Sequence, residues 1–167
     1  MARLDRGRKA VGSRSPMTVT LRPEQPSDEA FLRNLVLETV AIELGAEAWP
    51  EPMRSDLLRM QYAARRHARL EAGQSFIVQA GDAASGWVVL APMDDGVHLV
   101  EIMILPALRG KGIGSAAIHE IFSKATGPVR LTVNRMNHGA IRLYERLGFR
   151  RTGEDEVRFF MERPPSA

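Results

Sequence analysis

The segment from Val97 to Leu105 is apolar at nearly every position and leads through a proline and a glycine-rich turn into a helix pattern that begins at Ile113. A strand that feeds directly into a helix needs a sheet on which that helix can pack, so this junction favours an α/β fold. The nearly continuous apolar character predicts that the strand is central and buried on both faces.

The rest of the chain alternates between helix and strand patterns. Apolar residues at helical spacing predict helices that end at Gly45, Gly73 and Gly148, and another over residues 113–124. In the second helix, from Met53 to Leu70, we expect Leu57, Leu58 and Ala64 to face inward and several arginines to face outward. Strand patterns occupy residues 18–22, 75–79, 86–90, 97–105, 129–133, 150–152 and 157–161. Together they predict a single domain with a mixed sheet and helices on its faces.

The glycine-rich turn has the features of a diphosphate-binding site. Gly112 and Gly114 carry no side chain, so backbone N–H groups can approach phosphate oxygens, and the positive end of the following helix favours negative charge. Arg109 and Lys111 add positive charge beside it. The turn therefore predicts a ligand that carries phosphate groups.

Two common phosphate-binding loops do not match this turn. A Walker loop needs Lys followed by Ser or Thr, whereas Lys111 is followed by Gly112. A dinucleotide-binding fingerprint needs a third glycine, where this chain has Ser115, and an acidic residue about 20 positions further on, where it has Asn134 and Arg135.

The pattern that does match is Arg-x-x-Gly-x-Gly after a strand ending in Ile-Leu-Pro, which resembles the pyrophosphate loop of the GNAT superfamily of acyl-CoA N-acyltransferases. A second segment, from Asn137 to Phe149, is similar to the downstream signature of that family: Asn-x-x-Ala-x-x-Leu-Tyr-Glu-x-Leu-Gly-Phe. The two segments follow in the family's order, about one helix and one strand apart. The resemblance covers about residues 17–163.

The resemblance implies a mixed, mostly antiparallel α/β (α+β) sheet of about six to seven strands with about four helices, in which two central strands splay apart. The slot between residues 97–105 and 129–133 would receive the pantetheine arm of acetyl-CoA, the cosubstrate. By similarity, backbone groups of Ile102 and Ile104 would hydrogen-bond the pantetheine amides. Six residues would bind the pyrophosphate: Arg109, Gly110, Lys111, Gly112, Ile113 and Gly114.

The family's reaction transfers an acetyl group to a primary amine by direct attack in a ternary complex, and the resemblance assigns Tyr144 as the acid that protonates the leaving thiolate. A phenol has a reference pKa near 10, so it is protonated at neutral pH. Packing of Tyr144 within its helix is the structural alternative. Asn137 would contact the pantetheine arm and Tyr144 the reacting end, although Asn137 suits a plain helix N-cap equally well.

Two residues of the central strand compete as general base. His98 lies four residues before Ile102, which predicts the same strand face, and a histidine can accept a proton near neutral pH. Glu101 is the competitor, and strand alternation predicts that it faces the opposite side. Water without a dedicated base is the third alternative.

The acceptor amine is not identified by these motifs. In the family the first two helices shape the acceptor pocket, which suggests Glu43, Glu47, Trp49 and Tyr62 as lining residues, though each also suits a structural role. A protein that binds acyl-CoA as a sensor and never turns over an amine is the alternative function. A homodimer is common in the family and stays open here.

Composition limits the remaining classes of function. The chain has no cysteine, which excludes disulfides, thiolate zinc sites and a cysteine nucleophile, and its four histidines lack paired metal-ligand spacing, so we expect no metal. The net charge of +3 divides into +4 from residues 1–16 and −1 from the rest, which makes nucleic acid an unlikely partner of the folded part. We expect residues 1–16 to be a disordered basic extension, residues 164–167 to be frayed, and the protein to be cytoplasmic, without a membrane span.

Overall fold

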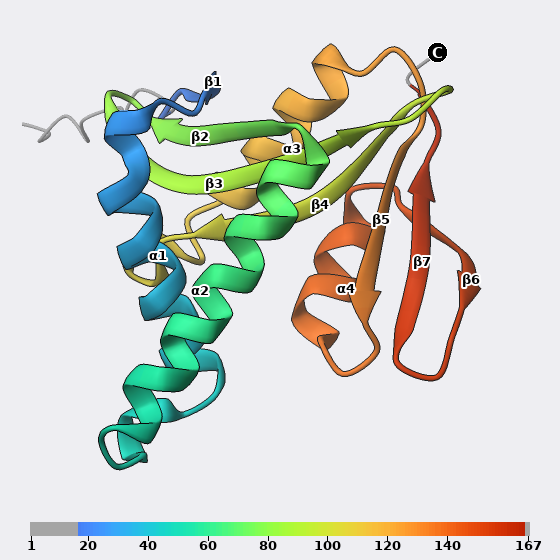
Figure 1. Cartoon of the computed structure of the whole chain (residues 1–167). Coiled ribbons are helices and arrows are strands. Elements are labelled where there is room, and N and C mark those ends of the chain that lie inside the picture. The colour runs from blue at the N-terminus through green and yellow to red at the C-terminus, as the bar shows by residue number, and fades with distance from the viewer. Residues whose placement is uncertain (1–16, 166–167) are drawn as a thin grey trace, which may run out of the picture.

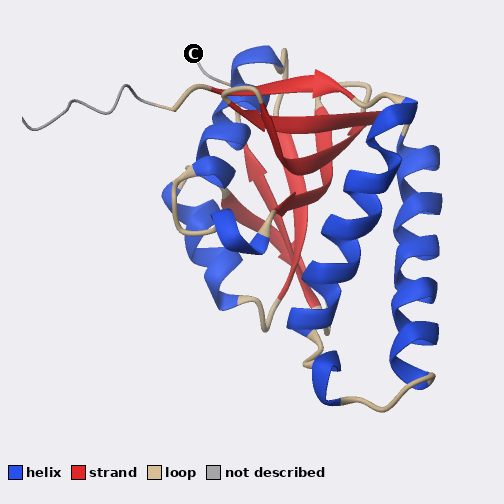
Figure 2. Cartoon of the chain, turned by 90° about the vertical axis from the view of Figure 1, so that its left-hand side faces the viewer, coloured by secondary structure: helices blue, strands red, loops and turns tan. Residues whose placement is uncertain are grey.

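The computed structural model describes residues 17–165, which form one seven-stranded sheet with helices on both faces (Figures 1 and 2). The strand order is β1-β2-β3-β4-β5-β7-β6, and only β4 and β5 run parallel. The predicted fold class is confirmed. The predicted basic extension, residues 1–16, and the last two residues of the predicted frayed end lie outside the described residues.

The strands and helices fall close to the predicted ranges. The strands are β1 Val19–Pro23, β2 Gln74–Ala80, β3 Ala83–Pro92, β4 Val97–Ile104, β5 Val129–Asn134, β6 Arg150–Glu154 and β7 Arg158–Arg163. The helices are α1 Glu29–Glu43, α2 Met53–Ala72, α3 Ile113–Lys124 and α4 His138–Arg146, with 3-10 turns at η1 Pro26–Asp28, η2 Ala46–Ala48 and η3 Pro106–Leu108.

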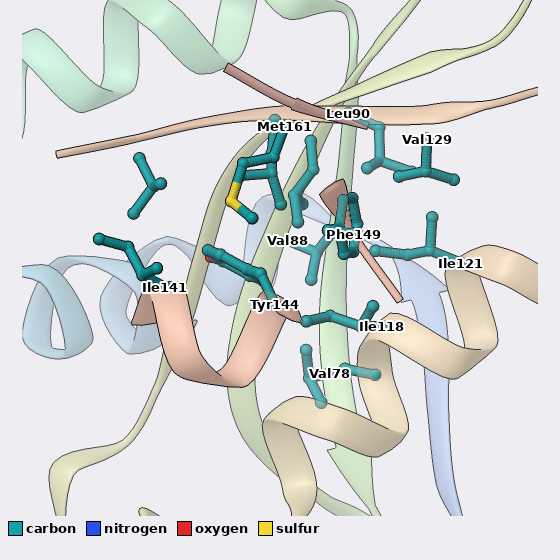
Figure 3. Packing of buried hydrophobic residues seen from close by; sticks show 14 of the residues in the cluster. Val78, Val88, Leu90, Ile118, Ile121, Val129, Ile141, Tyr144, Phe149 and Met161 are labelled. Atoms are coloured by element: carbon teal, nitrogen blue, oxygen red, sulfur yellow. The ribbon is translucent and has the colours of Figure 1, made fainter. Parts of the chain in front are cut away.

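Each face of the sheet carries its own hydrophobic cluster. On one face α3 and α4 contribute Ile118, Ile121 and Ile141, which pack on residues such as Val88 of β3 (Figure 3). On the other face α1 contributes Leu32, Leu35, Val36 and Val40, which pack on Ile77, Trp87, Val89 and Met103. The apolar spacing of each helix thus determines which face of the sheet it covers.

Helix α2 differs from the sequence prediction on its inner face. Arg69 is buried and pairs with Glu24 at 3.2 Å and Glu29 at 3.4 Å, whereas Ala64 is exposed. The prediction that Ala64 faces inward is therefore wrong. Several arginines of this helix do face outward, Arg66 among them, but the burial of Arg69 was not predicted. Hydropathy spacing missed it because a buried arginine is stable only when carboxylates from other elements meet it, and those lie far away in sequence.

Strands β4 and β5 are joined over only three residue pairs, from Val97–Val129 to Leu99–Leu131. Beyond Leu99 the two strands diverge, as Figure 1 shows, so the edge of β4 that faces β5 has no strand partner from Val100 to Ile104. This is the predicted splay. It also means that β4 is central but only partly buried, because Val100 is 39% exposed, so the prediction of burial on both faces holds only in part.

A β-bulge in β4 reverses the alternation of its side chains. Val89 of β3 pairs with Glu101 and the next residue, Leu90, pairs with Leu99, which leaves Val100 as the extra residue. Leu99 and Ile102 consequently pack into the same cluster, on the α3 side. The predictions that His98 shares a face with Ile102, and that His98 and Glu101 face opposite sides, are both wrong, because strict alternation fails across a bulge.

Candidate functional site

The glycine-rich turn between β4 and α3 exposes backbone rather than side chains. Gly110 and Gly112 have φ angles of 75° and 81°, a left-handed conformation that glycine adopts without cost, and a Cβ at either would meet no atom within 4 Å. Helix α3 begins immediately after Gly112, so the N–H groups of its first turn have no helical acceptor. The Ile113 side chain is buried, so this residue offers its backbone alone to a ligand. The turn fits a phosphate group.

Arg109 ties this turn to the opposite face of the sheet. Its Nε donates a hydrogen bond to the Ile104 carbonyl at 3.2 Å, and a terminal nitrogen donates to the Thr39 hydroxyl of α1 at 3.4 Å. Thr39 is itself buried. Lys111 is exposed and makes no such hydrogen bond within residues 17–165. The guanidinium of Arg109 is thus held beside the turn by two hydrogen bonds, whereas the Lys111 side chain is surrounded by solvent.

The unpartnered edge of β4 leads from the turn toward α4. The side chains of Ile102 and Ile104 pack against the α3-side cluster, which leaves their backbone at the diverging edge. At the start of α4, Asn137 caps the helix, because its side-chain oxygen accepts the Ala140 N–H at 3.1 Å. The N-cap role expected as one alternative is therefore present, and the amide NH₂ of Asn137 remains available to a ligand.

Tyr144 faces the core from α4, where its ring meets Phe149 edge to face at 5.6 Å (Figure 3). It is 8% exposed. Burial, with a smaller contribution from the charge of Glu101, raises the pKa of Tyr144 to about 12. The phenol is therefore protonated throughout the physiological range, as a proton donor must be.

Glu101 lies just after the bulge, on the face that α1 and α2 cover. Burial raises the pKa of Glu101 to about 7; Arg65 of α2 opposes that rise and Glu43 of α1 adds to it. A carboxyl group with a pKa near 7 can both take and give a proton at neutral pH. Sequence reasoning named Glu101 and Glu43 but missed Arg65, since nothing in a helical pattern distinguishes one arginine of α2 from the others.

His98 lies in the paired part of β4, beside Arg130 of β5. It is half-buried, and burial together with the charge of Arg130 lowers its pKa. The bulge turns its side chain away from the cluster that contains Ile102. Glu101 therefore lies where β4 and β5 have begun to diverge, whereas His98 lies in the part of β4 that is still paired with β5.

The four suggested acceptor residues separate into two groups. Glu43 lies close enough to affect Glu101, and the Tyr62 hydroxyl donates a hydrogen bond to Glu29, which favours the structural alternative for Tyr62. Glu47 and Trp49 lie in the connection between α1 and α2, which extends beyond the sheet in Figure 1. Trp49 is 36% exposed there. Of these residues, Glu43 is the one whose charge acts on Glu101.

No helix within residues 17–165 combines the length and the apolar character that crossing a bilayer requires. The same residues contain no group of three His, Asp or Glu side chains arranged to hold a metal ion.

Comparison with known proteins gives consistent results. Residues 34–149 match the acetyltransferase (GNAT) family. The peptidyl-lysine N-acetyltransferase YjaB of Salmonella typhimurium is 32% identical over 79 residues, which cover 42% of this chain and 54% of that protein. The protein of the same name from Escherichia coli is 31% identical over 80 residues, covering 48% and 51%. The chain thus matches about half the length of these curated relatives.

Solved structures share the fold over nearly the whole chain. The PaiA N-acetyltransferase from Thermoplasma acidophilum, in complex with coenzyme A, superposes with a TM-score of 0.68 at 20% identity, covering 89% of this chain and 99% of that one. The ribosomal-protein-S18-alanine N-acetyltransferase from Escherichia coli gives 0.63 at 18% identity, covering 90% and 96%. At these identities the similarity concerns the fold.

Proposed function

The chain belongs to the acetyltransferase (GNAT) family, and on that premise we propose that it transfers the acetyl group of acetyl-CoA to a primary amine. The observation that carries the proposal is the junction at the end of β4. There a glycine turn that presents the first N–H groups of α3 meets a strand edge that has no partner. A pyrophosphate with a long amide-containing arm fits both features together.

Acetyl-CoA would lie with its pyrophosphate on the turn and its pantetheine along β4. The backbone of residues 110–114 would bind the phosphates, with Arg109 and Lys111 as counter-charges. Backbone groups of Ile102 and Ile104 would pair with the pantetheine amides as an added strand would. The free amide NH₂ of Asn137 would reach the same arm from the start of α4.

Glu101 and Tyr144 would divide the proton transfers. The neutral amine attacks the thioester carbonyl, its proton passes to the Glu101 carboxylate directly or through water, and the C–S bond breaks. Tyr144 donates its hydroxyl proton to the departing thiolate. The positions found on β4 favour Glu101 over His98 as the base, because Glu101 lies where the strands diverge and carries a pKa suited to neutral pH.

A peptidyl lysine is the acceptor to test first. The curated relatives are named for that acceptor, and an ε-ammonium group approaching from the α1–α2 face would meet the carboxylates of Glu43 and Glu101. These carboxylates would attract the cation, whose ammonium proton would pass to solvent before the neutral amine attacks and Glu101 accepts the second proton.

Calorimetric titration with acetyl-CoA, with free CoA and with NADH tests the cofactor assignment. We expect micromolar binding of the first two and none of NADH. Release of CoA thiol in the presence of lysine-containing peptides then tests the transfer. The chain has no cysteine, so a thiol reagent reports the product alone. Binding without release from any amine would support the alternative of an acyl-CoA sensor, and absence of binding would refute the cofactor site.

A further inference from the structure

One side-chain atom within residues 17–165 is buried and has no hydrogen-bond partner: the Nε of Arg65. The other end of this guanidinium is held, because a terminal nitrogen donates to the Gln61 amide oxygen at 2.8 Å on the same helix. Buried donors are nearly always paired, so an unpaired N–H donor beside a candidate catalytic residue is unusual.

The nearest oppositely charged atom to this donor is Oε2 of Glu101, at 3.6 Å. That separation makes an ion pair but is too long for a good hydrogen bond. Both side chains are about three-quarters buried, with 25% and 28% exposed, so their interaction is less screened than that of a surface pair. A shift of well under 1 Å would turn this contact into a charge-assisted hydrogen bond.

The titratable groups that face Glu101 come from three helices. Arg65 of α2 is the cation, Glu43 of α1 is a second carboxylate, and Tyr144 of α4 is a neutral phenol. Within the described residues, Arg65 is thus the positive group that balances Glu101 against burial and against Glu43. Without Arg65, an ionised Glu101 would face the negative charge of Glu43 with no cation to offset it.

We infer that Arg65 is a positioning residue whose Nε–H closes onto the Glu101 carboxylate when that carboxylate is ionised, and holds it where β4 and β5 diverge. This inference rests on the proposed role of Glu101 as general base. Arg65 itself contacts neither the amine nor the thioester. It acts by keeping the Glu101 carboxylate ionised and oriented, while the hydrogen bond to Gln61 holds the other end of the guanidinium.

Carbon-detected NMR titration of the Glu101 carboxyl tests the inference without needing turnover. In Arg65→Gln the midpoint should move upward by about 1 pH unit, and in Arg65→Lys, which keeps the charge, by less than half of that. In Glu43→Gln it should move downward, since a like charge is removed. Arg66→Gln, on the exposed side of the same helix, is the matched control and should leave the midpoint unchanged.

The pH dependence of kcat/KM gives the second readout. The acidic limb should move in the same directions as the NMR midpoints, with KM for acetyl-CoA unaltered. An unchanged Glu101 midpoint in both Arg65 variants, or the same upward shift in Glu43→Gln, would overturn the inference. Failure of the wild-type protein to acetylate any amine would refute the proposed function instead, and the NMR titration would still decide the role of Arg65.

Discussion

The two faces of the sheet differ in the kind of side chain that they bury. The α3–α4 face is apolar, and Tyr144 is the titratable group in its core cluster. The α1–α2 face buries apolar residues as well, but charged groups surround them: Arg69 with Glu24 and Glu29, and Arg65 with Glu101. The reacting centre that we propose lies where β4 and β5 diverge.

This difference suits the two halves of an acyl transfer. The apolar face with the glycine turn accommodates a cofactor that is bound through backbone and phosphate contacts. The charged face can attract an ammonium ion and remove its proton. The bulge at Val100 connects the two, because it directs Glu101 to the charged face while Ile102 returns to the apolar one.

The first prediction tests whether the charged face is also a structural support. Arg69→Ala removes a cation that is 7% exposed and leaves Glu24 and Glu29 without it. Loss of one partner from a buried pair costs about 3–5 kcal/mol of the free energy of unfolding. Urea denaturation measures the loss. Arg66→Ala, whose side chain is 54% exposed and 4.0 Å from Glu29, should cost less than about 0.5 kcal/mol.

Equal effects of the two substitutions would contradict this distinction between a buried and a surface arginine. The sheet-side stability of α2 would then come from its apolar contacts, such as Leu58 and Tyr62, instead of from the ion pairs.

The comparison of the faces also shows what the sequence could predict. Helix ends at glycine, the α3 range and the splay were predictable, because they depend on local patterns and on one motif. The orientation of Glu101 and His98 was not, because a bulge depends on how β3 pairs with β4. The carboxylate partners of Arg65 and Arg69 were not predictable either, since each lies 36 to 45 positions away in the chain and meets its arginine only in the folded protein.

The second prediction concerns the cofactor side. Arg109→Ala should weaken acetyl-CoA binding by about 1.5–3 kcal/mol, the usual scale of a charge-assisted contact. Thr39→Val, which removes the hydroxyl that Arg109 contacts, should weaken binding less. Calorimetric titration measures both, with Arg33→Ala on the exposed side of α1 as the control. Unchanged affinity in Arg109→Ala would make the turn a structural element only.

The third prediction isolates the proton donor. Tyr144→Phe keeps the ring that packs on Phe149 and removes the hydroxyl. We expect turnover to fall at least tenfold, about 1.4 kcal/mol, while acetyl-CoA affinity stays nearly the same. Steady-state kinetics and titration separate the two effects. Turnover at the wild-type level would leave Tyr144 as a core residue and assign the thiolate's proton to water.

The smallest effect that we predict is in stability, and it depends on pH. The pKa of Glu101 is about 7 in the folded protein, above its ordinary value of 4.5, so folding favours the protonated form. Its contribution to stability is complete below pH 4.5 and is lost as the pH rises to 7. Glu101→Gln cannot ionise and should therefore gain about 1 kcal/mol relative to wild type between pH 4.5 and 7.5, after allowance for the solvent that reaches this side chain. Urea denaturation at several pH values measures the difference, with Glu38→Gln on the exposed surface of α1 as the control. A gain that is the same at every pH would mean that Glu101 ionises as readily in the folded state as in the unfolded chain. Burial on the charged face would then not raise the pKa of Glu101, and this argument for Glu101 as the base would fail.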